Sequence, residues 1–234
     1  MTHNITKTST TQHNPAAGGG LLILLCAPSH DTLTQYTSGL LAGFPSLGAP
    51  ALLHKFSSPL RYDQLLASLP INQQATDVAL VFCGHGEPSE LQGPGAHPGA
   101  PGYSDARSAF YDSSLLQAGA VPKFMLAFCS SAAADLGPAY WRNSSGQVFV
   151  GFDKKIGFVI KDGDCADWWK KLLHGAATAM LNNAGAVDPE EPLRQLYKSA
   201  IAYFNSPEGR RRCKWWLAMS MYLRRQLDSL KFIP

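Results

Sequence analysis

The chain has 234 residues, of which 45% are hydrophobic and 16% charged, and its formal net charge is +3. This length suits one domain with a substantial core, and so small a positive charge argues against nucleic acid as a partner. The longest aliphatic run, residues 21–27, is far shorter than the roughly 20 residues of a membrane-spanning helix, so we expect no contact with a membrane.

The number and spacing of the cysteines indicate the cellular compartment and whether a metal site is expected. The five cysteines are odd in number and form no CxxC motif, which fits neither a disulfide framework nor a zinc site. We therefore expect a cytoplasmic protein without a metal or other cofactor. Cys26 and Cys83 are expected in the core, and Cys165 and Cys213 are expected to have no partner.

Apolar runs alternate with helix-like segments along the chain. Residues 1–20 contain almost no apolar residues and are predicted to form a flexible tail before a single domain at residues 21–234. Strands are predicted at residues 21–27, 51–56, 77–83, 123–129, 148–152 and 156–160, and helices at 32–42, 62–68, 107–118 and 132–141. Continuous apolar strands separated by helices predict an α/β fold with about six mainly parallel strands and helices on both faces. We expect the second strand outside the first, and the fourth beside the third.

The end of the chain follows a different pattern. The last two predicted strands are joined by only three residues, which predicts a closely spaced pair whose last strand runs antiparallel at an edge. Residues 164–234 carry apolar residues at helical spacing and are predicted to form helices packed on the core. Within them GRRRCKWW, residues 209–216, is interpreted as a solvated first turn whose tryptophans pack inward, rather than as a site for phosphates.

One segment, residues 86–106, is rich in glycine and proline and has no periodic pattern. We expect it to be a long loop without regular structure, and loops of this length inside compact domains are usually functional or disordered. The segment starts directly after His85, which stands between two glycines in FCGHG at the end of a predicted strand. We therefore expect this loop to be mobile or to cover the groove beside the histidine.

A histidine and a cysteine follow two consecutive predicted strands. His85 follows the strand at 77–83, and Cys129 ends the strand at 123–129 in LAFCSS. Because the carboxyl ends of neighbouring parallel strands meet at one edge of the sheet, the two side chains are expected to lie side by side. A helix N-terminus can stabilise a thiolate, and a nearby imidazole can transfer protons. The backbone N–H groups of Gly86 and Cys129 are candidates for an oxyanion site.

The two motifs resemble those of the caspase-like cysteine proteases, a group that includes caspases, legumains, gingipains, separases and CHAT domains. In that group a strand ending in His-Gly precedes a strand ending in Cys-x-Ser, and FCGHG and LAFCSS match this order. A third segment, GFVIKDGDCADWWKKLL at residues 157–173, is similar to part of separases and of small CHAT domains. The resemblance covers about residues 21–181. The chain departs from many relatives in having Phe128 before the cysteine and Ala132 after Ser131.

The resemblance implies a caspase-like three-layer sandwich and a cysteine endopeptidase that cuts a protein or peptide substrate with a His85–Cys129 dyad. It also implies regulation by an upstream protease or a protein activator, and small bacterial members act in defence pathways. Relatives that cut after a basic residue line their pocket with a carboxylate. On this basis Asp162, Asp31 and Asp164 are candidates for the substrate pocket, with Asp162 preferred. Each of these aspartates could instead cap the helix that follows it.

Two other interpretations stay open at this point. Cys129 could be a buried structural thiol and His85 a turn residue, in a non-catalytic interaction module that keeps the fold. Alternatively, an α/β-hydrolase-type thiol hydrolase would need His174 as its base. Such enzymes have glycines two residues before and after the nucleophile, where this chain has Ala127 and Ser131.

Overall fold

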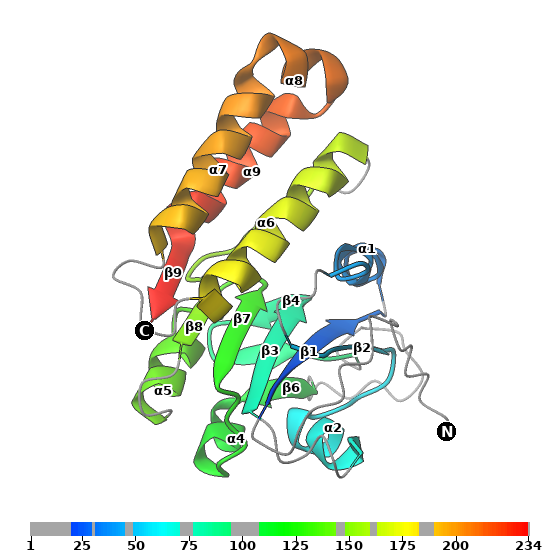
Figure 1. The fold of residues 1–234 in the computed structure, drawn as a ribbon, viewed down its shortest axis with the longest axis vertical. Helices are drawn as coiled ribbons and strands as arrows, with labels where there is room; N and C mark the ends of the chain where they lie inside the picture. Colours follow the sequence, from blue (N-terminus) through cyan, green and yellow to red (C-terminus); the bar gives the residue numbers. More distant parts are fainter. Residues whose placement is uncertain are drawn as a thin grey trace.

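The computed structural model describes residues 20–29, 31–44, 49–70, 77–94, 108–143, 148–159, 163–182 and 190–233. These residues form two sheets and the helices around them (Figure 1). The larger sheet consists of β1 (Leu21–Pro28), β2 (Ala51–Phe56), β3 (Asp77–Cys83), β7 (Phe124–Phe128), β8 (Val148–Phe152) and β9 (Leu230–Ile233). The smaller sheet consists of β4 (His85–Glu87), β5 (Glu90–Gln92) and β6 (Ala109–Asp112). The helices are α1 (Thr32–Leu40), α2 (Tyr62–Ser68), α4 (Ser113–Gln117), α5 (Leu136–Asn143), α6 (Gly163–Asn182), α7 (Glu190–Asn205), α8 (Pro207–Arg212) and α9 (Trp216–Ser229).

The larger sheet has the strand order β2-β1-β3-β7-β8-β9, and its strands are parallel except for β9. Strands β1, β3 and β7 lie in the middle, and nearly all of their residues are buried because other elements cover both faces of the sheet. The predicted α/β fold is confirmed, with β2 outside β1 and β7 beside β3.

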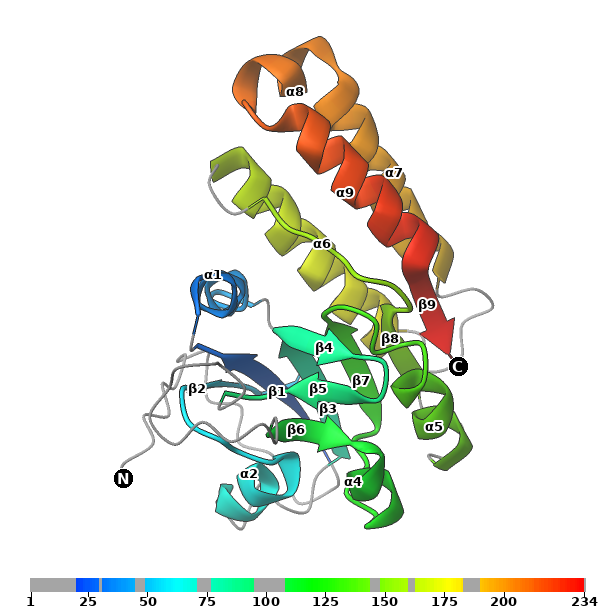
Figure 2. The same cartoon turned by 180° about the vertical axis from the view of Figure 1, so that it is seen from behind.

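Two hydrophobic clusters, one on each face of the larger sheet, make up the core. Successive strand residues point to opposite faces, so Leu24 belongs to one cluster and Leu25 to the other. Helices α1, α6, α7 and α9 contribute to the cluster of Leu25, whereas α2, α4, α5 and the smaller sheet contribute to that of Leu24 (Figures 1 and 2). The molecule therefore has the expected three layers.

The antiparallel edge strand comes from the C-terminus and not from residues 156–160. Strand β9 pairs with β8, whereas residues 155–159 form no strand. They pack on α9 instead, where Gln226 Nε2 donates to the carbonyl of Gly157 at 2.9 Å. A Cβ on Gly157 would lie 2.8 Å from the ring of Tyr222, so the two segments are in close contact. The prediction of an antiparallel last strand is confirmed, but its assignment to residues 156–160 is wrong.

The segment predicted to be a long loop begins as a β-hairpin. Strands β4 and β5 pair antiparallel, and β5 pairs in turn with β6. Leu91 and Tyr111 are paired across β5 and β6 and are fully buried, so apolar side chains on one face hold this sheet to the core. The expected loop is therefore wrong for residues 86–92, and the helix predicted at 107–118 is β6 followed by the short helix α4. Residues 95–107 and the predicted tail up to residue 19 lie outside the described residues.

Helices α7, α8 and α9 form a helical hairpin, here called the C-terminal arm (residues 190–229), which extends from the sheet alongside α6 (Figures 1 and 2). Met219 and Leu223, two residues of the predicted helical stripe, are fully buried between the arm and the rest of the core. The expectation that both tryptophans of GRRRCKWW pack inward is wrong for Trp215, which is 44% exposed. Within the described ranges, no helix is both long and apolar enough to cross a membrane.

Candidate active site

The ends of β3 and β7 bring the two predicted catalytic side chains to the same edge of the sheet. The strands are parallel neighbours, and Cys83 at the end of β3 pairs with Phe128 at the end of β7. His85 lies two residues beyond the first strand, and Cys129 lies one residue beyond the second. The predicted adjacency of the two strand ends is confirmed.

Gly86 is the point of contact between the two strand ends. A Cβ atom added to this glycine would lie 2.5 Å from the sulfur of Cys129 and 2.6 Å from the carbonyl oxygen of Ser130. No side chain fits there, which is a physical reason for glycine after the histidine. Gly86 therefore lies directly against the side chain of Cys129.

The ring of His85 forms a hydrogen bond with the side chain of Asp31. Its Nε2 lies 2.7 Å from Oδ2 of Asp31, which stands just after β1 at the start of α1. An ionised carboxylate only accepts hydrogen bonds, so the Nε2 atom carries a hydrogen, and in the neutral ring the lone pair is at Nδ1. The side chain of His85 is 38% exposed, so the ring is accessible from solvent.

The second oxygen of Asp31 caps helix α1. Oδ1 accepts from the backbone N–H of Thr34 at 2.8 Å and from its hydroxyl at 3.1 Å. Partial burial opposes the charge on Asp31, but the hydrogen bond from the Thr34 backbone and the hydrogen bond and charge of His85 outweigh it and lower the pKa of the carboxyl group. Asp31 thus caps helix α1 with one oxygen and holds the ring of His85 with the other.

Cys129 is fully buried in the core cluster below the smaller sheet. This burial raises the pKa of its thiol well above the usual range, and the neighbouring thiol of Cys83 adds to the increase. The expected helix N-terminus is not available to stabilise a thiolate. Helix α5 begins only at Leu136, and the backbone N–H of Leu136 donates to the carbonyl of Pro88 in the β4–β5 turn at 2.8 Å. In this conformation the burial of Cys129 favours the thiol over the thiolate.

The turn after Cys129 is held by the segment that follows β8. The backbone N–H of Ser131 donates to the carbonyl of Lys154 at 3.1 Å, and that of Ile156 donates to the hydroxyl of Ser130 at 3.2 Å. Ser131 has a φ of +62°, and among the described residues it alone takes a positive φ without being glycine. This conformation is costly for a residue with a side chain, and such strain is often found at functional sites.

The remaining pocket candidates are not placed beside the cysteine by any described contact. Asp164 lies in the first turn of α6, and its Oδ2 accepts from the hydroxyl of Tyr203 on α7 at 3.3 Å. Asp162 lies outside the described residues. In the part of the chain that the structure describes, no group of three or more His, Cys, Asp and Glu side chains is arranged to hold a metal ion.

Sequence analysis named Asp31 as a candidate for the substrate pocket or a helix cap and missed its hydrogen bond to His85. The sequence D-T-L-T at residues 31–34 is typical of a helix cap, and a cap needs only one carboxylate oxygen. His174, the base needed by an α/β-hydrolase, packs edge-on against Phe44 with ring centroids 5.0 Å apart. Phe44 belongs to the cluster on the opposite face of the sheet from Cys129, so His174 is not placed to act on that thiol.

No protein-family model and no curated protein matches this chain.

Proposed function

We propose that this protein is a cysteine endopeptidase of the caspase-like type, with His85 and Cys129 as its catalytic dyad. The observation that carries the proposal is the contact between the two strand ends, where Gly86 lies directly against the sulfur of Cys129. The residue before that glycine is a histidine whose ring is bonded to the carboxylate of Asp31. A purely structural thiol would not need a carboxylate-oriented histidine next in sequence to the glycine that contacts it.

In the proposed mechanism the sulfur of Cys129 attacks the carbonyl carbon of the scissile peptide bond, and its proton passes to Nδ1 of His85. Backbone N–H groups of Gly86 and Cys129 bind the oxygen that becomes negatively charged. The imidazolium then donates its proton to the leaving amine, and water hydrolyses the acyl-enzyme. Asp31 stays on Nε2 throughout, so Nδ1 is the nitrogen that exchanges protons.

The burial of Cys129 implies that the described conformation is a resting one under this proposal. Gly86 lies against the sulfur, which is fully buried, so a substrate reaches it only when the β4–β5 hairpin or the turn after Cys129 moves. The hairpin is bonded to the start of α5 through the carbonyl of Pro88. We propose that a protein activator or an upstream protease releases these contacts.

The substrate is proposed to be a protein or peptide cut after a basic residue. This preference now depends on Asp162, because the other two candidates already make hydrogen bonds. Asp31 is hydrogen-bonded to His85 and Thr34, and Asp164 is hydrogen-bonded to Tyr203. A buried, unpaired carboxylate would favour a basic side chain, since leaving the charge without a partner is costly. A role in a bacterial defence pathway is a proposal that rests on the resemblance alone.

A non-catalytic interaction module is the second candidate, and the complete burial of Cys129 is the observation that favours it. In such a module the His85–Asp31 hydrogen bond would only hold the start of α1 to the start of β4. The two candidates differ in one respect that can be measured, which is whether peptide bonds are cut.

Digestion of a peptide library by the wild type and by Cys129→Ala tests the proposal. We expect cleavage by the wild type and none by the variant. Cys26→Ala is the matched control, because Cys26 is equally buried in the same core cluster and takes no part in the mechanism. Full activity of Cys129→Ala would refute the nucleophile, and a wild type that cuts no peptide, with or without a candidate activator, would favour the non-catalytic module.

A further inference from the structure

Two cysteines far apart in the sequence meet beneath the outer end of the C-terminal arm. Cys165 lies in the first turn of α6, and Cys213 lies between α8 and α9, 48 positions later in the chain. Their sulfur atoms are 3.0 Å apart, and both side chains are fully buried. The expectation that neither cysteine has a partner is therefore wrong.

The fold fixes the position of Cys213 closely. Its backbone N–H donates to the carbonyl of Gly209 at 2.9 Å, and its carbonyl accepts from the N–H of Trp216 at 3.1 Å. Gly209 in turn is pressed against Tyr203 at the end of α7, where no Cβ atom would fit. Cys213 therefore sits in a tight junction between the three helices of the arm.

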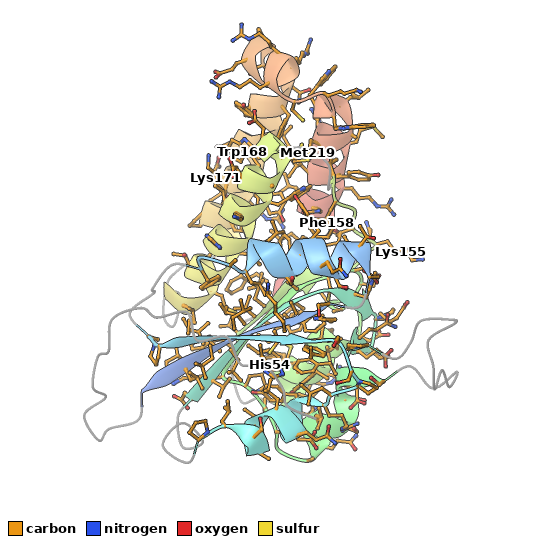
Figure 3. The ribbon with its side chains drawn as sticks, turned by 90° about the vertical axis from the view of Figure 1, so that its right-hand side faces the viewer. His54, Lys155, Phe158, Trp168, Lys171 and Met219 are labelled. Carbon is orange, nitrogen blue, oxygen red and sulfur yellow. The ribbon has the colours of Figure 1, made fainter. Side chains whose placement is uncertain are left out.

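Cys165 is held against this junction by the packing of α6. The carboxylate of Asp164, the preceding residue, accepts from the hydroxyl of Tyr203 at 3.3 Å. One turn further on, the ring of Trp168 contacts those of Tyr203 and Phe204, at centroid distances of 5.4 and 6.2 Å. Trp168 and the buried Met219 both lie between α6 and the arm (Figure 3). The two thiols are thus brought together by contacts on either side of them.

We propose that Cys165 and Cys213 are a disulfide site, which joins the N-terminal end of α6 covalently to the junction of α8 and α9. Closing the bond brings the sulfurs from 3.0 Å to about 2.05 Å, a small movement for two side chains that already face each other. No third His, Cys, Asp or Glu ligand accompanies the pair among the described residues, so a metal site is not the better explanation.

The oxidation needs a small disulfide, such as oxidised glutathione, as the electron acceptor. The thiolate of one cysteine attacks a sulfur of that molecule, which releases one glutathione thiolate and leaves a mixed disulfide. The second cysteine thiolate then attacks the protein sulfur of the mixed disulfide, forms the Cys165–Cys213 bond and releases the second glutathione thiolate. The two protons lost by the cysteines are taken up by the two glutathione thiolates, and the two electrons reduce the oxidant. Because both sulfurs are buried, the first attack occurs when this end of α6 opens or before it packs during folding.

The cross-link would affect the stability of the C-terminal arm. It would also affect residues 156–159, the segment that connects α6 with the turn after Cys129. It closes a loop of 48 residues through α6, α7 and α8, which restricts the unfolded chain. The segment just before α6 is bonded to this helix, since Trp169 Nε1 donates to the carbonyl of Val159 at 3.2 Å. In the same segment, the backbone N–H of Ile156 donates a hydrogen bond to the hydroxyl of Ser130. The proposal itself stands independently of any peptidase activity.

Disulfide mapping by mass spectrometry tests the proposal. The reduced wild type is incubated with oxidised glutathione, and in parallel is unfolded and refolded in a mixture of reduced and oxidised glutathione so that burial cannot block access. After denaturation and alkylation of the remaining thiols, we expect a Cys165–Cys213 cross-linked peptide in the refolded sample, with alkylated Cys26, Cys83 and Cys129. The cross-linked protein should melt about 5–15 °C higher than the reduced protein.

Cysteine variants supply the controls. Cys165→Ala and Cys213→Ala should each abolish the rise in melting temperature caused by the oxidant, whereas Cys26→Ala should keep it. Because oxidised and reduced samples of the same variant are compared, a general loss of stability in a variant does not obscure the result. Five alkylated cysteines in the refolded wild type, or a cross-link between any other pair, would overturn the proposal.

Discussion

Asp31 and His85, 54 residues apart in the sequence, are joined by a hydrogen bond. The carboxylate oxygen Oδ2 lies 2.7 Å from the ring nitrogen Nε2. This hydrogen bond connects the start of α1, just beyond β1, with the first residue of β4, two residues beyond the end of β3. The same carboxylate caps α1 through its other oxygen. The orientation of the histidine is therefore tied to the start of a helix, which is a rigid part of the fold.

Replacing Asp31 by asparagine should reduce peptidase activity without unfolding the protein. Asparagine has a single side-chain oxygen, and the cap to Thr34 is expected to use it, so the amide N–H groups would face Nε2 of His85. The ring then carries its hydrogen on Nδ1, the nitrogen that has to accept the proton of Cys129. We expect kcat/KM on the best library peptide to fall by on the order of 10²–10⁴-fold.

The control for this variant is its own unfolding curve. Because asparagine is as good a helix cap as aspartate, the free energy of unfolding near pH 7 should change by less than about 1 kcal/mol. Unchanged kcat/KM in Asp31→Asn would show that the bond to His85 does not position a catalytic group.

The lowered pKa of Asp31 predicts how stability depends on pH. A carboxyl group with a lowered pKa in the folded state stabilises the protein above its unfolded pKa, and this contribution is lost as the pH falls through the folded value. The wild type should therefore lose stability as the pH falls below about 4, and Asp31→Asn should lose less over the same interval. Urea unfolding at several pH values measures the difference, and parallel curves for the two proteins would contradict it.

A methyl group at position 86 should damage the site locally. In Gly86→Ala the new Cβ would meet the sulfur of Cys129 and the backbone of Ser130, which cannot move away easily. We expect a loss of about 1–3 kcal/mol in the free energy of unfolding, as for other overpacked positions. Gly39→Ala is the matched control, because Gly39 lies in helix α1 with nothing within 4 Å of its added Cβ. That substitution should instead stabilise the protein by about 0.5–1 kcal/mol. Equal stability of the two variants would show that Gly86 is not in contact with Cys129.

Much of the fold was predictable because the parallel strands of the larger sheet are long, apolar and separated by helices. The segments that sequence reasoning misassigned are short or carry a misleading local signal. Strands β4 and β5 have three residues each and lie in a stretch rich in glycine and proline, so only their packing on the core defines them. Leu230 continues the helical spacing of α9, yet it is the first residue of β9, because the free edge of β8 offers backbone partners there.

The sequence was enough to predict where the candidate site lies, but not that Cys129 is buried or that His85 is hydrogen-bonded to Asp31. Parallel strands place His85 and Cys129 at one edge of the sheet, and the motifs alone are enough to infer this. The burial of Cys129 depends on the β4–β5 hairpin, which the sequence presents as a loop. The bond between Asp31 and His85 depends on side-chain geometry, which no spacing in the sequence reveals.

The strained turn after the cysteine can be tested by substitution. Ser131 has a φ of +62°, a conformation that costs a residue with a side chain about 1–2 kcal/mol and glycine almost nothing. Glycine also loses more freedom on folding, so Ser131→Gly should be equal to the wild type or slightly more stable. Ser131→Val should be less stable by at least about 1 kcal/mol, because a β-branched residue fits this conformation poorly. A valine variant as stable as the wild type in urea unfolding would show that the turn does not adopt this backbone.

Covalent labelling with a peptide that carries a thiol-reactive electrophile at its cleavage position measures directly whether Cys129 is the nucleophile. The labelled residue is located by mass spectrometry in the wild type, in His85→Ala and in Cys129→Ala, with a small alkylating agent as the reference reagent. We expect the wild type to be labelled at Cys129 alone, and faster by the peptide than by the small reagent, because a bound peptide holds its electrophile near the sulfur whenever the cover over it opens. Labelling should be slow in His85→Ala and absent in Cys129→Ala. Labelling of another cysteine, or equal rates in the wild type and His85→Ala, would contradict a His85–Cys129 dyad.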